Sequence, residues 1–319
     1  METMSQGKNM IKEKKKLSFK RNLKIIGKDW QLYSLLLLPL IYYVIFKYGP
    51  MIGNIIAFRK YVPGGPVFGT EWIGLKYFKI FIADPTFWGV FKNTLMISVL
   101  SLIIGFPFPI IFALLLNEFK GGKFKKFVQT ASYLPYFLST VVVAGMIMEL
   151  LSPSSGVINM AIKHFTGHTI DFLAKPEWFR TIYISSGIWQ GLGWGAILYL
   201  AALSGINMEL YESAKIDGAN RWKQTLHVTI PGIMPTIVIL LILNIGGLLA
   251  VGYEKILLLY NPLTYPTADV LSTYLYRMGL ESNNFSYATA IGLFESIIGL
   301  ILITAANQIS KKVSDTSLW

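Results

Sequence analysis

The chain has 319 residues, of which 53% are hydrophobic and only 14% are charged, and its formal net charge is +12. Soluble domains carry roughly a quarter charged residues, so the composition excludes an ordinary water-soluble domain and indicates a membrane protein. The absence of cysteine excludes disulfides, thiolate metal sites and cysteine nucleophiles.

Residues 1–29 form a basic N-terminal tail, and an apolar stretch follows from Trp30 to Phe58. This stretch is too long for the core of a signal peptide, and no small-residue cleavage site closes it. We therefore expect a retained first span. The transmembrane region is predicted to cover 30–310, with a C-terminal tail at 311–319.

Six apolar stretches are long enough to cross a bilayer, which requires about 20 residues in a helix. We therefore predict an all-α polytopic membrane protein. Between the last two spans, the Leu257–Tyr260 run is short and ends at Asn261-Pro262, so we expect segment 252–285 to be a surface element or re-entrant turn. The predicted spans are 31–56, 88–116, 127–151, 180–204, 231–252 and 286–308.

Prolines lie inside several predicted spans, at Pro39, Pro107, Pro109 and Pro135. Neighbouring helices and water can satisfy the carbonyls that an interior proline leaves free. We interpret these prolines as kinks that serve packing, with a gating hinge as the alternative.

The basic residues indicate the orientation of the spans. The two tails and the loops at 117–126 and 205–230 hold 18 of the 29 Lys and Arg residues, and the opposite loops hold nine. An excess of Lys and Arg marks the cytoplasmic side, so both termini are predicted to be cytoplasmic. The positive charge is then a topology signal and does not indicate a nucleic-acid partner. The N-terminal tail is also suited to contact anionic membrane lipid.

The predicted cytoplasmic loop 205–231 has the pattern of two short helices. Leu210 and Ala214 are four residues apart and share a helix face. Gly218 is a natural helix terminator because glycine tolerates the left-handed conformation. Asp217 is a candidate cap for the second helix, and Pro231 suits the first turn of the next span.

Small residues at the bend of this loop would allow another surface to approach closely. Trp222 and Leu226 lie four apart in the second helix, and Glu212 supplies a charge in the first. The pattern alone fits either an element that docks into a partner or an ordinary amphipathic connector.

The same loop resembles the EAA motif of ABC importer permeases, in which Glu-Ala-Ala, three residues and Gly precede a spacer and Ile-x-Leu-Pro. The chain departs from that pattern at Ser213, Val228 and Ile230, and each replacement is similar in size. The resemblance implies that the loop couples to an ATPase through Glu212, Ser213, Ala214, Asp217, Gly218, Ala219 and Pro231.

Further segments resemble the polysaccharide-type (LplB-like) sugar permeases of the maltose-permease superfamily, and the similarity covers nearly the whole chain from about residue 20. They are Phe46–Met51, Leu114–Glu118, Gln129–Pro135, Gly193–Ala196, Tyr260–Pro262, Ser286–Gly292 and the terminal Leu318-Trp319.

This resemblance implies the type I importer fold in a bacterial cell membrane. It implies a second homologous permease, two copies of a cytoplasmic ATPase, and an extracellular solute-binding protein that delivers an oligosaccharide. The chain has no Gly-x-x-x-x-Gly-Lys-Ser/Thr motif. We therefore expect a permease subunit without enzymatic activity or cofactor, with ATP and Mg²⁺ on the partner ATPases.

Polar residues inside spans are candidates for the substrate pathway because burying them in lipid is costly. The candidates of this kind are Asn93, Gln190, Asn244 and Glu295. The alternative for each is an interhelical hydrogen bond.

Aromatic residues add candidates, since sugars are bound by polar groups together with flat aromatic faces. Trp189, Trp194 and Tyr253 have this character. The competing interpretation is the belt of Trp and Tyr at a membrane interface.

His164 and His168 are four residues apart, but no cysteine joins them and Gly167 weakens the helix that they would need. We interpret them as loop histidines and predict no metal site.

Other classes remain to be compared with a sugar importer. A permease for a non-sugar solute would share the loop motif. A secondary transporter would need inverted repeats and a buried ionisable coupling site, whereas only Glu295 is an evident buried acid. A non-transporting scaffold would have no need for the loop pattern.

Overall fold

The computed structural model describes residues 28, 30–119, 121–313 and 317–318. The predicted tail 1–29 therefore lies almost wholly outside the described residues. The chain divides into two units, 1–55 and 56–319, and each is described by itself. The first unit is helical, as predicted for the first span. It consists of α2 (Trp30–Tyr43), η1 (Val44–Tyr48), α3 (Gly49–Ile52) and the start of η2 (Gly53–Phe58).

The second unit is helical throughout its described length, apart from connecting loops and one isolated bridge between Arg59 and Trp72. Its elements are α4 (Lys76–Ala83), α5 (Pro85–Leu100), η3 (Ser101–Gly105), α6 (Pro107–Glu118), α7 (Lys123–Tyr133), η4 (Leu134–Phe137), α8 (Thr140–Leu151), α9 (Val157–Thr166), α10 (Pro176–Ser204), α11 (Met208–Ile216), α12 (Arg221–Gln224), η5 (Thr225–Thr229), α13 (Ile230–Gly246), α14 (Tyr253–Leu259), α15 (Tyr265–Ala268), α16 (Leu271–Tyr276), η6 (Arg277–Glu281) and α17 (Phe285–Val313).

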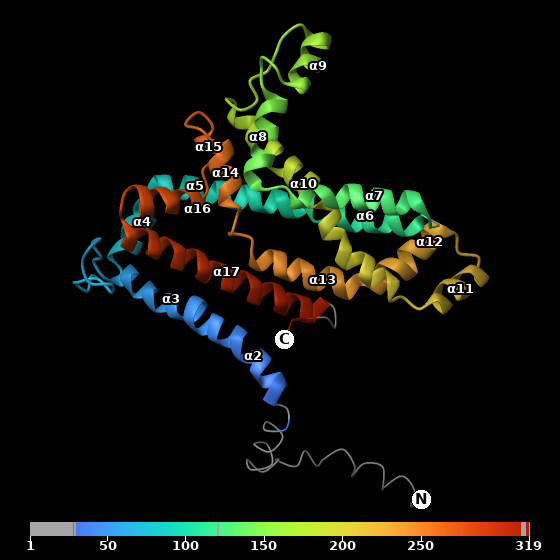
Figure 1. The fold of residues 1–319 in the computed structure, drawn as a ribbon, viewed down its shortest axis with the longest axis horizontal. Coiled ribbons are helices and arrows are strands. Elements are labelled where there is room, and N and C mark those ends of the chain that lie inside the picture. The colour runs from blue at the N-terminus through green and yellow to red at the C-terminus, as the bar shows by residue number, and fades with distance from the viewer. Residues whose placement is uncertain (1–27, 29, 120, 314–316, 319) are drawn as a thin grey trace, which may run out of the picture. The chain divides into compact units, whose positions relative to one another are not determined.

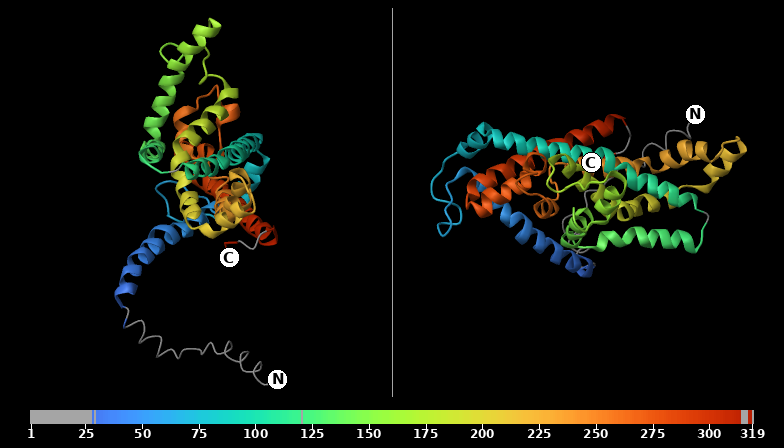
Figure 2. Two further views of the ribbon diagram at one scale, coloured as in Figure 1. Left: turned by 90° about the vertical axis from the view of Figure 1, so that its right-hand side faces the viewer. Right: turned by 90° about the horizontal axis from the view of Figure 1, so that it is seen from above.

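The long helices of the second unit run alongside one another. Helix α10 packs against α6 and α13, and α13 packs against α17. Helices α11 and α12 lie at one end of this bundle, and the 59–75 loop and α4 lie at the other (Figure 1). Helix α9 extends beyond the other helices, and α8, which leads to it, packs against α14 (Figures 1 and 2).

Four described helical runs are long and apolar enough to cross a membrane, and there are up to six if each of two bent pairs forms one span. The four are Trp30–Phe58, Pro85–Glu118, Arg221–Gly246 and Phe285–Lys312. The bent pairs are Lys123–Phe137 with Thr140–Leu151, and Pro176–Ser204 with Met208–Ile216. The chain is thus a multi-pass membrane protein with four to six candidate spans.

The predicted span 127–151 is not one continuous helix, because the chain bends by 100° between η4 and α8, as a broken span or a re-entrant loop does. Pro135 cannot donate a backbone hydrogen bond, and it lies in the short 3₁₀ segment η4. The Ser139 side chain then accepts a hydrogen bond from the Val142 backbone N–H and starts α8. At 1.5 Å per residue, the 12 residues of α8 are shorter than the hydrocarbon core of about 30 Å.

Prolines at the start of two long helices follow wide π turns. The π turn η3 ends two residues before Pro107, and η5 ends two residues before Pro231. A proline ring clashes with the carbonyl four residues earlier in a regular helix, so a wider preceding turn relieves that clash. The helical path therefore continues through both prolines without a break.

Small residues on α10 allow close approach to its neighbours. A Cβ atom at Gly193 would lie only 2.2 Å from the backbone oxygen of Ser132 on α7, and one at Gly195 would lie 3.0 Å from the Pro109 ring on α6. Pro109 thus takes part in the packing of α6 against α10.

Segment 252–285 folds into α14, α15, α16 and η6, and it contains no span, as predicted. It is more buried than a surface element, however. Ile256 and Leu271 are fully buried, and Lys255 and Asp269 are also buried. The segment packs against α5, α8, α10 and α17, so its apolar residues are covered by the bundle itself.

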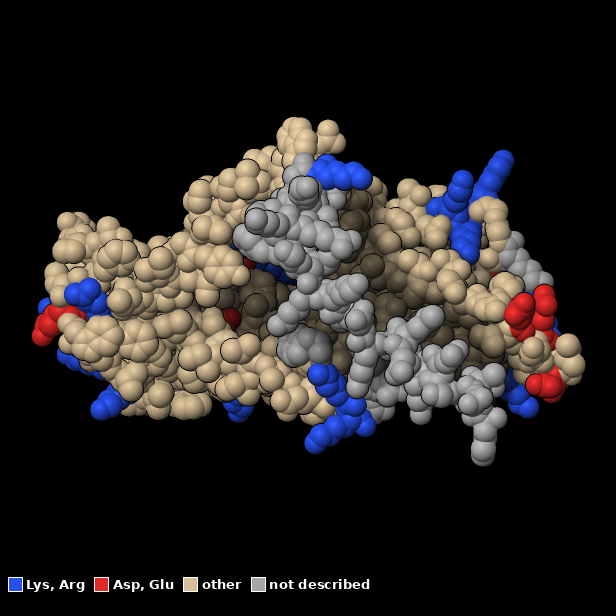
Figure 3. All heavy atoms as spheres, turned by 90° about the horizontal axis from the view of Figure 1, so that it is seen from below, with Lys and Arg blue, Asp and Glu red and all other residues tan. Residues whose placement is uncertain are grey.

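The surface of the long helices is apolar. Figure 3 shows one face, on which uncharged residues make up most of the visible surface. Exposed apolar side chains follow the candidate spans of the second unit, among them Leu115, Leu243 and Leu300. Such a surface is suited to lipid rather than to water.

Candidate functional site

Loop 205–231 is a helix–turn–helix, as the sequence predicts. Helix α11 ends at a turn where Gly218 adopts a positive φ of 74°. The Gly218 N–H donates to the oxygen of Lys215, and the Ala219 N–H donates to the oxygen of Ala214. These bonds satisfy the last carbonyls of α11, so the left-handed glycine closes the helix.

Two details of this loop differ from the prediction. Asp217 does not cap the second helix; the Asn220 side chain does, by accepting a hydrogen bond from the Lys223 N–H at 2.9 Å. Pro231 lies in the first turn of α13, as predicted, but the candidate span begins earlier, because α12, η5 and α13 form the continuous run Arg221–Gly246. The second helix of the loop is therefore the first part of a candidate span.

Side-chain contacts fix the two helices of the loop to each other. The hydroxyl groups of Tyr211 and Thr229 lie 3.0 Å apart. The Gln224 amide donates to the oxygen of Ala219 at 2.7 Å. The Arg221 guanidinium forms an ion pair of 2.8 Å with Glu118, which ends α6. The ion pair with Glu118 thus ties the loop to the bundle.

The outer surface of the loop combines small, charged and apolar side chains. Glu212 and Ser213 are exposed, and Ala214 and Ala219 are half-buried at the bend. Five large apolar side chains are also exposed, with Ile216 at 86% and Trp222 at 73%. A soluble loop rarely exposes so many, so this surface is suited to contact a partner. The five are Met208, Leu210, Ile216, Trp222 and Leu226.

A cavity of about 670 Å³ lies between α5, α10, α13 and α14. Three of the predicted pathway residues line it: Gln190 on α10, Asn244 on α13 and Tyr253 on α14. Its volume is in the range of sites that bind small molecules.

The other predicted pathway residues lie elsewhere. Trp189, Trp194 and Glu295 are absent from the lining of the cavity. Trp194 instead stacks on Tyr136, with ring centroids 4.5 Å apart. Their role in the pathway remains a prediction.

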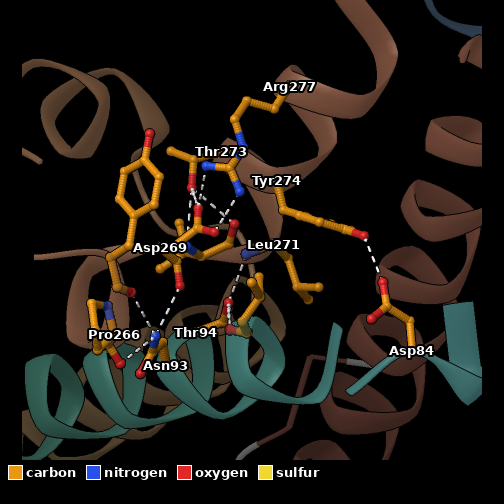
Figure 4. A network of polar contacts seen from close by, with 12 residues as sticks. Asp84, Asn93, Thr94, Pro266, Asp269, Leu271, Thr273, Tyr274 and Arg277 are labelled. Atoms are coloured by element: carbon orange, nitrogen blue, oxygen red, sulfur yellow. Dashed lines mark hydrogen bonds and ion pairs between the residues drawn. The ribbon is translucent and has the colours of Figure 1, made fainter. Parts of the chain in front are cut away.

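Asn93 forms the interhelical hydrogen bonds that were the alternative interpretation, and it does not line the cavity. Its amide nitrogen donates to the backbone oxygens of Pro266 and Asp269, at 3.0 and 3.2 Å. Figure 4 shows this side chain directed from α5 toward the 266–269 segment. Its oxygen accepts a hydrogen bond from Arg180 on α10 at 2.9 Å. Asn93 thus joins three parts of the fold.

An ion pair near Asn93 was not predicted. Arg277 donates to both carboxylate oxygens of Asp269, at 3.0 and 2.6 Å, and Thr273 donates to the same carboxylate (Figure 4). The two residues are eight apart in a segment without a clear helical pattern, so the sequence carried no signal for the pair.

Two polar residues of the cavity were also missed. Lys255 on α14 and Ser98 on α5 both line it and are both buried. The only signal for Lys255 was a lone cation just beyond a long apolar run. Ser98 lies inside a predicted span, where a single serine is common.

The histidines show no arrangement for a metal. His164 lies in α9, but the helix ends at Gly167, which has a φ of 78°, so His168 is outside the helix. Among the described residues no group of three or more His, Cys, Asp or Glu side chains is placed to hold a metal ion.

Comparison with known proteins places these features in a family. Residues 105–315 match the family described as binding-protein-dependent transport system inner membrane component. The chain is 46% identical to the polygalacturonan/rhamnogalacturonan transport system permease protein YteP of Bacillus subtilis (strain 168), over 90% of each chain. It is 43% identical to Protein LplB of the same organism, over 92% of each.

A solved structure is also similar. A chain of a bacterial alginate ABC transporter, in complex with an alginate pentasaccharide-bound periplasmic protein, matches with a TM-score of 0.85 and 45% sequence identity. The match covers 92% of the present chain and 99% of that chain.

Proposed function

This chain belongs to the binding-protein-dependent transport system inner membrane component family, and on that premise we propose that it is the permease subunit of an ATP-driven oligosaccharide importer. The structure of loop 205–231 is the main support for this proposal. The loop has a left-handed turn at Gly218, half-buried alanines at the bend, and an outer surface that includes the exposed Glu212 and Trp222.

An ATPase is the partner that best fits this projection. The loop resembles the motif by which such permeases contact their ATPases, and the chain lacks a nucleotide-binding motif of its own. We infer that Glu212 and the Asp217-Gly218 turn enter a cleft on the ATPase. ATP and Mg²⁺ would be bound there, on the partner subunits, and movement of the cleft would be transmitted through α12 into α13.

An oligosaccharide is the substrate that the relatives support. One relative is named for polygalacturonan and rhamnogalacturonan transport, and the similar solved structure is of an alginate transporter. The cavity adds side chains that can hydrogen-bond to sugar hydroxyls, Gln190 and Asn244, and an aromatic ring, Tyr253. We infer that the cavity lies on the substrate pathway.

The complete importer would contain a second homologous permease, two ATPase copies and an extracellular solute-binding protein that delivers the sugar. The excess of basic residues in the tails and in the loops at 117–126 and 205–230, taken together, supports a cytoplasmic position for both termini. Alternating access would then carry the sugar from the binding protein to the cytoplasm of a bacterial cell.

Reconstitution tests this function. The chain is co-purified with its second permease and ATPase, placed in proteoliposomes, and supplied with the binding protein and labelled oligosaccharides. We expect accumulation that requires both ATP and the binding protein. Uptake driven by an ion gradient without ATP would indicate a secondary transporter, and ATP-driven uptake of a non-sugar solute alone would indicate the other alternative.

A further inference from the structure

Lys255 places a buried cation in the wall of the cavity. The residue is 8% exposed, and it lines the cavity together with Gly187 and Tyr183 of α10. Its ammonium donates a long hydrogen bond of 3.4 Å to the backbone oxygen of Tyr183 and lies 5.2 Å from the centre of that ring. A Cβ atom at Gly187 would lie 4.0 Å from the Lys255 nitrogen. The absence of a side chain there leaves the ammonium open to the cavity.

Lys255 forms no ion pair with a carboxylate in the described part of the chain. The two ion pairs found there are Arg221–Glu118 and Arg277–Asp269. The adjacent Glu254 also lines the cavity, but its side chain is exposed and forms no ion pair with Lys255. Burial lowers the pKa of Lys255 to about 8, which still leaves the ammonium mostly protonated at neutral pH. A buried cation without an anion is costly, so an anionic ligand in the cavity would recover a desolvation cost that the protein already bears.

A second polar group in the cavity also lacks a partner. Ser98 lines it, is 8% exposed, and among the described residues its hydroxyl group makes no hydrogen bond. Buried hydroxyl groups are normally satisfied, so an unsatisfied one in a cavity wall points to a ligand. The hydroxyl group can both donate to and accept from a sugar hydroxyl.

We propose that Lys255 binds the carboxylate of an acidic sugar residue in the transported oligosaccharide, with Ser98 bonding to a hydroxyl group of the same ligand. The proposal rests on the proposed function and narrows its substrate to oligosaccharides that carry uronic acids. One cation among hydroxyl and amide groups suits a ligand that has one carboxylate per ring and many hydroxyl groups.

Equilibrium binding tests the assignment on the permease–ATPase complex without the binding protein, so that the binding protein's own selectivity does not contribute. The probes are tetragalacturonate and its methyl ester, measured by isothermal titration calorimetry. The variants are Lys255→Gln, Lys255→Arg and, as a matched control, Lys79→Gln at an exposed lysine of α4.

We expect Lys255→Gln to weaken tetragalacturonate binding by about tenfold or more, the factor for losing a hydrogen bond to a charged group. Binding of the methyl ester should stay within about twofold of wild type. Lys255→Arg should retain most of the affinity, because it keeps the charge, and Lys79→Gln should bind as wild type does.

Equal weakening of acid and ester in Lys255→Gln would overturn the proposal, because it would indicate a structural role for the lysine. Equal affinity of the wild type for the two probes, or no binding of tetragalacturonate, would overturn it as well. These outcomes are distinct from failure of the proposed function, which is judged by whether the complete importer accumulates any oligosaccharide with ATP.

Discussion

The Arg221 guanidinium lies 2.8 Å from the carboxylate of Glu118, across 103 residues of sequence. Arg221 begins the helical run that continues into α13, and Glu118 is the last residue of α6. The pair therefore joins loop 205–231 to the end of a neighbouring helix. In the proposed importer it lies where movement of the ATPase would enter the bundle.

Removing this ion pair should affect coupling more than stability. The side chains of Arg221 and Glu118 are 63% and 48% exposed, and exposed pairs contribute about 0.2–1 kcal/mol to stability. We expect Arg221→Ala to leave the thermal unfolding midpoint nearly unchanged and to reduce substrate-stimulated ATP hydrolysis several-fold. The exchanged pair Arg221→Glu with Glu118→Arg should restore much of the stimulation, and its failure to do so would show that the charge contact is not what transmits movement.

Glu212 should be essential for coupling. It is exposed on α11, so reversing its charge costs little folding free energy. It would, however, place a cation where we infer a contact with the ATPase. We expect Glu212→Arg to insert into the membrane normally and to lose substrate-stimulated ATP hydrolysis.

Glu209 offers a matched control, because it is exposed on the same helix and lies three residues earlier. Glu209→Arg should retain most of the stimulation. Normal coupling in Glu212→Arg would contradict the assignment of the loop, and equal loss in both variants would indicate a general electrostatic effect rather than a specific contact.

Much of the loop could be predicted because its signals are local. The left-handed turn follows from Gly218, since glycine adopts that conformation without steric cost. The cap was misassigned to Asp217 because Asp and Asn are both good caps, and only the observed start of α12 selects Asn220. The identity of the cap depends on where α12 begins, and the sequence alone does not locate that boundary to a single residue.

The cavity was less predictable because its wall combines distant segments. Gln190, Asn244 and Tyr253 were identified by their residue types, but Ser98 and Lys255 meet them only in the folded bundle. Asn93 shows the converse. It is a polar residue within a candidate span, and its side chain already forms hydrogen bonds with Arg180 and with the 266–269 segment. The residue type alone indicates that burying a polar side chain in a span is costly. Only the fold shows whether the side chain bonds to other protein groups or is left open to a ligand.

Gly218→Ala should weaken binding of the ATPase to the permease by straining the backbone at the turn. An added Cβ atom meets no atom within 4 Å, so steric contact contributes nothing. The cost is that of holding alanine at a φ of 74°, about 1–2 kcal/mol. We expect weaker retention of the ATPase on the purified permease, measured by co-elution. Gly205→Ala is the control because Gly205 has a φ of −88°. Unchanged retention in Gly218→Ala would argue against a role for the turn conformation.

Asp269→Asn should destabilise the second unit more than any surface change. The Asp269 side chain is 7% exposed and that of Arg277 is 19% exposed, so the substitution leaves a partly buried guanidinium without its counter-charge. Breaking a buried pair in this way costs about 3–5 kcal/mol. Tyrosine rings at 5.0 and 5.8 Å from the guanidinium would offset part of that cost. The measurement is the midpoint of thermal unfolding of the purified complex in detergent.

The double variant Asp269→Asn with Arg277→Gln distinguishes the effect of an unpaired charge on stability from the effect of other lost contacts. Removing both partners of a buried pair is often close to neutral, so the double variant should be more stable than Asp269→Asn alone. Asn93 donates to the backbone oxygen of Asp269 and not to its carboxylate, so that contact persists in both variants. If the double variant were as unstable as the single one, the loss would not come from the unpaired charge of Arg277. The hydroxyl group of Thr273, which donates to Asp269 at 2.8 Å, can still donate to an amide oxygen at that position.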